Sequence, residues 1–204
     1  MATHIQKALQ AKIDRREELL KRSLTASQQA VRHKCFVSYH HADEDEVETF
    51  IDSFESVFIP RVLGISDEDV DLIDSTDTDY VMDQIREKYL TDSTVTVVLV
   101  GKCTWARRYV DWEVYSSLRN DKLNRRSGLV AITLPSIANF SDRALPPRVD
   151  DNVNGDDGYA RWKKYPASEG SLRSMVEEAF QARSSKAGVI VNTRARKINN
   201  SSCS

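Results

Sequence analysis

Short apolar segments alternate with amphipathic segments along most of the chain. The strongest apolar segment, TVTVVLVG at 94–101, is almost entirely β-branched and shows no polar alternation, which is typical of a strand covered on both faces. Similar runs stand at 35–39, 58–66 and 128–135, and apolar residues at helical spacing mark the segments 43–57, 78–90, 107–121 and 171–183. This alternation predicts an α/β fold of three layers, with a central, mostly parallel sheet and helices on both of its faces.

Three regions follow from this pattern. Residues 1–33 are expected to form an N-terminal amphipathic helix extension, which packs on its own domain or, less favoured, serves self-association. Residues 34–192 form one domain, in which 136–169 reads as irregular and GVIVNT at 188–193 as a last edge strand. Residues 193–204 are expected to form a flexible polar tail that frays.

Composition narrows the class of protein. The 204 residues are 40% hydrophobic and 29% charged, with a net charge of -2, so neither nucleic acid nor an anionic membrane is an expected partner. Cys35, Cys103 and Cys203 form no CxxC pair, so the sequence predicts no zinc site and no disulfide framework, and the thiols suit a reducing compartment. No apolar run reaches the roughly 20 residues of a membrane span, and the N-terminus has no apolar signal core, so a cytoplasmic location is expected.

The residues that follow the strands are the first candidates for a site, because open parallel sheets bind ligands at the carboxyl ends of their strands. Ser38, Tyr39 and His40 follow the first strand, and Gly101–Thr104 followed by Trp105 follow the strand at 94–101. The two loops become neighbours if these two strands pair. Gly101–Thr104 lacks the first glycine of a phosphate-binding loop, so that function is not expected.

Glu113 is the candidate catalytic group. It stands one helical turn after Tyr109, so the two share a face of the helix that follows the central strand. From spacing alone, the alternative is a surface carboxylate paired with Arg107 or Arg108. The acid-rich stretch 43–79 is expected to be a solvated face, not a metal site.

Two segments carry a resemblance to a known family. CFVSYHHADEDEV and VTVVLVGKCTWARRYVDWEVYSSL resemble TIR and TIR-like domains, and the VDWE run, with LPPRVDDN and RWKKYP further on, is most similar to TIR-like proteins of bacterial Thoeris antiphage systems. The likeness spans about 34–183. It implies a flavodoxin-like fold, with NAD+ as substrate and no cofactor. It also implies cleavage of the nicotinamide–ribose bond to a cyclic ADP-ribose-type signal that reaches a separate effector protein.

The same resemblance implies roles for single residues. Glu113 maps onto the catalytic glutamate, while Ser38, Tyr39 and His40 border the substrate. From the spacing alone, Trp105 and Tyr109 are expected to flank Glu113, and the ring of Tyr39 or Trp105 can stack on nicotinamide or adenine.

Two alternatives remain at this level. A non-catalytic TIR-like scaffold would work by homotypic assembly, and a homo-oligomer on activation is compatible with either function. A receiver-like phosphoacceptor domain shares the sheet type, but it requires an aspartate where this central strand ends in Val100–Gly101–Lys102.

Overall fold

The computed structural model describes residues 12–18, 31–62, 90–120, 125–140 and 144–203. The chain divides into two compact units, Met1–Arg32 and His33–Ser204. In the first unit, residues 12–18 are helical, as the sequence predicts, and the rest of the predicted N-terminal helix lies outside the described residues.

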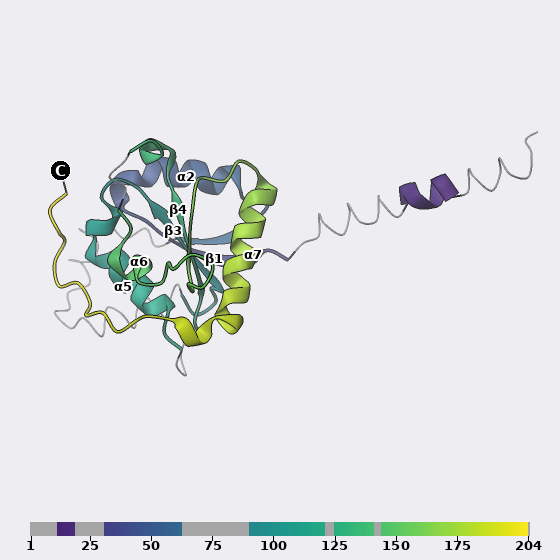
Figure 1. The fold of residues 1–204 in the computed structure, drawn as a ribbon. Coiled ribbons are helices and arrows are strands. Elements are labelled where there is room, and N and C mark those ends of the chain that lie inside the picture. Colours follow the sequence, from purple (N-terminus) through teal and green to yellow (C-terminus); the bar gives the residue numbers. More distant parts are fainter. Residues whose placement is uncertain (1–11, 19–30, 63–89, 121–124, 141–143, 204) are drawn as a thin grey trace, which may run out of the picture. The chain divides into compact units, whose positions relative to one another are not determined.

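The second unit is built on a five-stranded sheet (Figure 1). Its strands are β1 (His33–Ser38), β2 (Phe58–Val62), β3 (Val95–Val100), β4 (Gly128–Thr133) and β5 (Arg161–Lys163). They lie in the order β2-β1-β3-β4-β5, and every pairing is parallel. The predicted α/β class is therefore confirmed, and so is the pairing of β1 with β3 that brings the two candidate loops together.

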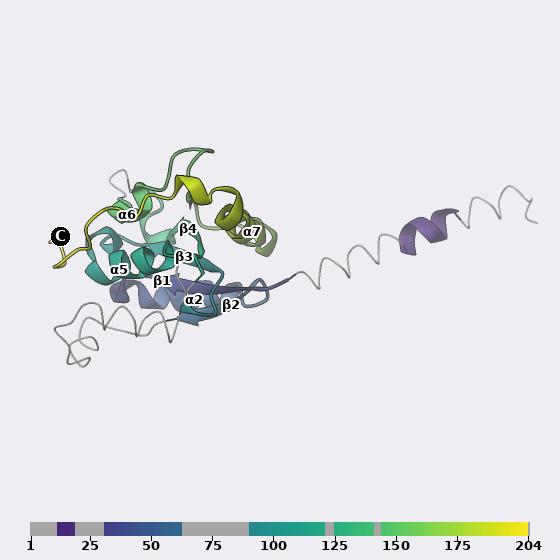
Figure 2. The same cartoon turned by 90° about the horizontal axis from the view of Figure 1, so that it is seen from below.

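Helices cover both faces of this sheet. They are α2 (Glu44–Ser53), α5 (Arg108–Ser117), α6 (Pro147–Asp150) and α7 (Glu169–Ser185). The described residues also form the short 3-10 turns η1 (His41–Asp43), η3 (Thr104–Ala106), η4 (Pro135–Ile137) and η5 (Ala187–Val189). Figures 1 and 2 show α7 on the opposite side of the strands from α5 and α6. The predicted helix 78–90 lies outside the described residues except for its last position.

The side chains of β3 explain why its sequence shows no alternation. Val95, Val97 and Leu99 pack in the core that contains α2 and α7, whereas Val98 and Val100 pack in the core that contains α5. All six residues of the strand are buried. A strand with an apolar layer on each side needs apolar residues at successive positions.

Two sequence predictions at the C-terminal side are wrong. GVIVNT forms no strand: its first two residues are the end of η5, and Val191 exchanges two hydrogen bonds with the side chain of Asn152. The fifth strand is β5, within the segment predicted as irregular, where Arg161–Lys163 pairs with Val130–Ile132. Backbone groups of the predicted strand thus find a side-chain partner in place of a sheet neighbour.

The C-terminal tail, which the sequence predicts to fray, is bound to the domain over much of its length. The main-chain N–H of Lys197 donates to Asp111, and the carbonyl of Lys197 accepts from the indole of Trp112. Further along, the Ser201 N–H donates to the carbonyl of Ala106 at 2.9 Å. Figures 1 and 2 both show the yellow tail running past α5.

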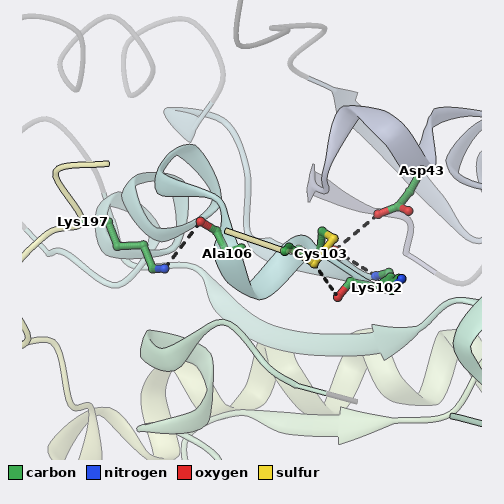
Figure 3. The surroundings of a disulfide bond; sticks show 8 residues. Asp43, Lys102, Cys103, Ala106 and Lys197 are labelled. Carbon is green, nitrogen blue, oxygen red and sulfur yellow. Dashed lines mark hydrogen bonds between the residues drawn. A yellow bond between two sulfur atoms is a disulfide. The ribbon is translucent and has the colours of Figure 1, made fainter. Parts of the chain in front are cut away.

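A disulfide fixes the end of this tail. Cys103 and Cys203 are bonded across 100 residues, with their Cα atoms 5.7 Å apart (Figure 3). The expectation of three separate thiols is therefore wrong, and Cys35 alone of the three remains a free thiol, buried in β1. A pairing across this separation has no local sequence pattern, because it depends on where the tail returns in space.

No helix among the described residues combines the length and the apolar character that a membrane crossing requires.

Candidate functional site

The site centres on a buried contact between the end of β1 and the second turn of α5. Ser38, the last residue of β1, donates a hydrogen bond from its hydroxyl to Oε2 of Glu113 at 2.5 Å. Ser38 is 1% exposed and Glu113 is 7% exposed. The alternative of a surface glutamate paired with Arg107 or Arg108 is therefore excluded by the structure.

The position of Glu113 follows from how α5 is fastened to the sheet. The Ser117 hydroxyl, one turn further along α5, donates to the carbonyl oxygen of Glu113 at 2.8 Å. Thr96 of β3 in turn donates to the Ser117 hydroxyl at 2.7 Å. This buried chain of hydrogen bonds links the Glu113 backbone to the central strand, so the carboxyl group is held on a rigid element.

Burial dominates the electrostatics of Glu113. It raises the pKa of this carboxyl from 4.5 to about 8, while the hydrogen bond from Ser38 lowers it by less. A buried carboxyl without a cationic partner favours its neutral form. Glu113 is thus a carboxylic acid held ready to ionise when a positive charge comes near, a property typical of functional sites.

Tyr39 follows Ser38 directly in sequence, and its phenol is influenced by the charge of Glu113. The pKa of its phenol is raised by burial, and further by the carboxylates of Glu44, Glu113 and Glu48. The ring is half-buried and packs against the core below α2. The end of β1 therefore places an aromatic ring within the electrostatic reach of Glu113.

A second polar network joins the loop after β3 to the loop after β1. The Gly101 N–H donates to Oγ1 of Thr104 at 2.9 Å, and Thr104 Oγ1 lies 3.4 Å from Oδ2 of Asp43. A Cβ on Gly101 would lie 2.2 Å from that same carboxylate oxygen, so a larger residue here would displace the Asp43 side chain from its position beside Thr104. Gly101 and Thr104 therefore hold the loop after β3 against the loop after β1. Asp43 is part of this contact, although the sequence analysis did not select it as a candidate.

The remaining predicted site residues lie near the same two loops, just before η1, on η3 or at the start of α5, and have other contacts. His40 is half-buried, and its carbonyl accepts from the Asp43 N–H at 2.8 Å. Trp105 lies in η3, with the ammonium of Lys197 5.7 Å from its ring centroid. Tyr109 packs edge-on against Trp112 and bonds to Arg108. The structure brings Ser38, Tyr39 and Glu113 together, and the substrate contacts of His40, Trp105 and Tyr109 stay a prediction.

Asp111 and Arg148 form a buried ion pair that sequence reasoning missed. The guanidinium of Arg148 binds both carboxylate oxygens of Asp111, at 2.9 and 3.2 Å, and both side chains are at most 2% exposed. Arg148 also donates to Oδ1 of Asn192 and to the carbonyl of Ala195. Because Asp111 stands two residues before Glu113, this pair fixes the helix that carries the candidate catalytic group.

A cavity elsewhere, between β5 and α7, is lined partly by Arg161, Glu178 and Lys186. These three charged groups already bind protein atoms: Arg161 pairs with Glu178 at 2.7 Å, and Lys186 reaches the carbonyls of Asp156 and Gly158. The cavity contains none of the predicted site residues. Within the described parts of the chain, no three His, Cys, Asp or Glu side chains gather as metal ligands would.

The raised pKa of Glu113 predicts a specific dependence of stability on pH. The folded protein holds a proton on Glu113 between about pH 4.5 and about pH 8, where the unfolded chain has lost it, so stability falls as pH rises through this window. Glu113→Gln removes the titration. We expect the unfolding free energy of this variant to exceed that of the parent by a margin that grows by up to roughly 1.4 kcal/mol per pH unit across the window, measured by chemical denaturation from pH 4 to pH 9. Parallel curves for the two proteins would show that Glu113 ionises normally.

One comparison with known proteins identifies a family. A protein-family profile described as Thoeris protein ThsB, TIR-like domain, matches residues 36–139. The match begins in β1, ends just after η4 and includes Ser38, Tyr39 and Glu113. No curated protein matches the chain at a significant level. The match covers just over half of the 204 residues, and the chain belongs to the family of TIR-like domains of the Thoeris protein ThsB.

Proposed function

We propose that the protein cleaves the nicotinamide–ribose bond of NAD+, with Glu113 as the catalytic residue. The observation that carries this proposal is the buried carboxyl group at the carboxyl edge of a parallel sheet, hydrogen-bonded to Ser38 and within electrostatic reach of the Tyr39 phenol. Dinucleotide sites in open α/β sheets lie at this edge. Membership of the ThsB TIR-like family supports the same proposal.

Cleavage of this bond requires little from the protein other than electrostatic stabilisation of the transition state. When the bond from ribose C1′ to the nicotinamide nitrogen breaks, its electron pair stays with the nitrogen, and nicotinamide leaves as a neutral molecule. Positive charge then develops on the ribose as an oxocarbenium-like species. A carboxylate held beside the ribose stabilises this charge, as carboxylates do in glycoside hydrolysis.

The neutral resting state of Glu113 is compatible with this role. A cationic nicotinamide ring close to the carboxyl group lowers its pKa, so that substrate binding itself favours the carboxylate. Ser38 donates to the same oxygen and adds to that preference. In the empty site the carboxyl group stays protonated near neutral pH.

The product depends on water at the reacting carbon. Attack by water on ribose C1′ gives linear ADP-ribose, whereas attack by a nucleophilic atom of the same molecule gives a cyclic product that is one water lighter. We propose the cyclic product, as a diffusible signal to a separate effector protein in antiphage defence, because the family profile is that of a Thoeris protein. Homo-oligomer formation on activation is part of the same proposal.

The direct experiment is to incubate the purified protein with NAD+ over a range of protein concentrations, so that assembly is sampled. We expect nicotinamide to accumulate, as measured by chromatography, with an equal amount of an ADP-ribose-type product identified by mass. Linear and cyclic products differ by the mass of one water. Absence of nicotinamide at every concentration, with intact NAD+ recovered, would contradict the proposal and favour a non-catalytic scaffold.

A further inference from the structure

The C-terminal tail is held by two sets of contacts of different character. The part near Lys197 binds Asp111, which is buried and already paired with Arg148. The part beyond it, residues 198–203, is held by hydrogen bonds of Ile198 and Asn200 at exposed positions and by the bond from the Ser201 N–H to the carbonyl of Ala106, and the side chain of Ile198 is 80% exposed. The Cys103–Cys203 disulfide is the covalent bond that closes this second part onto the domain.

This second part of the tail completes the start of α5. The residue before the helix, Arg107, provides no side-chain cap. The first helical N–H, that of Arg108, instead donates to Oδ1 of Asn200 at 2.8 Å. Capping of otherwise unpaired N–H groups stabilises a helix terminus. Residues 198–203 thus support the helix that carries Glu113, although they lie about 90 positions away in sequence.

The other end of the disulfide is joined to the site through the loop after β3. Cys103 stands between Gly101 and Thr104, the two residues whose hydrogen bond is joined to Asp43. Figure 3 shows the disulfide with Lys102, Ala106 and Lys197 around it and Asp43 on the facing loop. Cys203 Sγ lies 3.8 Å from the carbonyl oxygen of Lys102, and both cysteines are partly accessible to solvent.

From this geometry we propose that Cys103–Cys203 is a redox site, whose reversible reduction by a dithiol releases residues 198–203 from η3 and the first turn of α5. A thiolate of the dithiol attacks one sulfur of the S–S bond and forms a mixed disulfide while the other cysteine leaves as thiolate. The second thiol of the reagent then displaces the remaining cysteine. The protein gains two thiols, and the dithiol is oxidised to its disulfide, so electrons and protons balance.

Amide hydrogen exchange before and after treatment with dithiothreitol tests this proposal without reference to NAD+. We expect the amides of Ser201 and Arg108 to exchange at least about tenfold faster after reduction, because their acceptors lie across the released contact. The Lys197 amide should keep its rate, because Asp111 holds it independently of the disulfide. Reoxidation with oxidised glutathione should restore the slow rates.

Matched variants separate the disulfide from other effects of reduction. Cys203→Ser should show fast exchange at Ser201 and Arg108 with or without dithiothreitol. Cys35→Ala should respond to reduction as the parent does, because Cys35 is buried in β1 and outside the disulfide. Burial also raises the pKa of the Cys35 thiol, so alkylation of the folded protein reports on Cys103 and Cys203.

Three results would overturn the proposal. The first is alkylation of both Cys103 and Cys203 without any reductant. The second is unchanged exchange at Ser201 and Arg108 after mass spectrometry has shown complete reduction. The third is failure of the slow rates to return after reoxidation, since the proposed reduction is reversible.

Discussion

Glu113→Gln is expected to reduce nicotinamide release from NAD+ by roughly 1,000-fold or more. The amide is close in size to the carboxyl group and can still accept the hydrogen bond from Ser38, but it cannot become negatively charged when positive charge develops on the ribose. Initial rates of nicotinamide formation, with protein concentration matched, measure the effect. Circular dichroism and thermal unfolding of the variant at pH 5 should match those of the parent.

Glu48→Gln is the matched control for this change. Glu48 is exposed on α2, and its carboxylate also acts on the phenol of Tyr39, so the substitution removes a nearby negative charge without touching the buried pair. Its rate should stay within about threefold of the parent, since exposed charges are screened. Retention of the parental rate by Glu113→Gln, or an equal loss in both variants, would refute the assignment of Glu113.

Arg148→Met is expected to lower the unfolding free energy by about 3 to 5 kcal/mol, because it leaves the Asp111 carboxylate buried without its ionic partner. Methionine is apolar and flexible enough to occupy much of the space of the arginine stem. Urea denaturation near pH 7 measures the change. Loss of the hydrogen bonds to Asn192 and Ala195 should also loosen the tail, visible as faster amide exchange at Lys197.

Arg194→Met provides the comparison for this second change. Arg194 also binds a carboxylate with two nitrogens, Asp151 at 2.6 Å for each, but its side chain is 47% exposed. Its loss should therefore cost no more than about 1 kcal/mol. The double change Asp111→Leu with Arg148→Met should recover part of the stability lost in the single variant. Equal destabilisation by Arg148→Met and Arg194→Met would show that burial of the Asp111–Arg148 pair does not increase the loss in unfolding free energy.

The parts of the fold that the sequence predicts are those with a strong local pattern. β3 and β4 are covered on both faces, so each has a continuous apolar run from which the strand can be predicted. β5 has only three residues, Arg161–Lys163, with partly exposed side chains, and such a segment has no pattern to detect. GVIVNT shows the reverse error: it has an apolar pattern, but the structure gives it no neighbouring strand.

The same distinction holds for the candidate site. Ser38 could be named because it lies at the carboxyl end of a recognisable strand, and Glu113 because it lies on the helix that follows one. The topology rule then places both at one edge of the sheet. Asp43, Arg148 and the Cys103–Cys203 bond depend on contacts between segments far apart in sequence. Nothing local marks an aspartate as buried, or a cysteine in a polar tail as paired.

Under the function proposed above, the hydrogen-bonded acid between β1 and α5 also bears on which form of a nicotinamide dinucleotide the protein would accept. A reduced nicotinamide ring is uncharged and offers nothing to offset the cost of ionising a buried carboxyl group. Beside such a ligand the Glu113 carboxyl group would stay protonated. The oxidised ring carries a positive charge, which would stabilise the ionised carboxylate. A single protonation equilibrium would then let the protein distinguish the oxidised from the reduced dinucleotide, without a separate residue to read the ring.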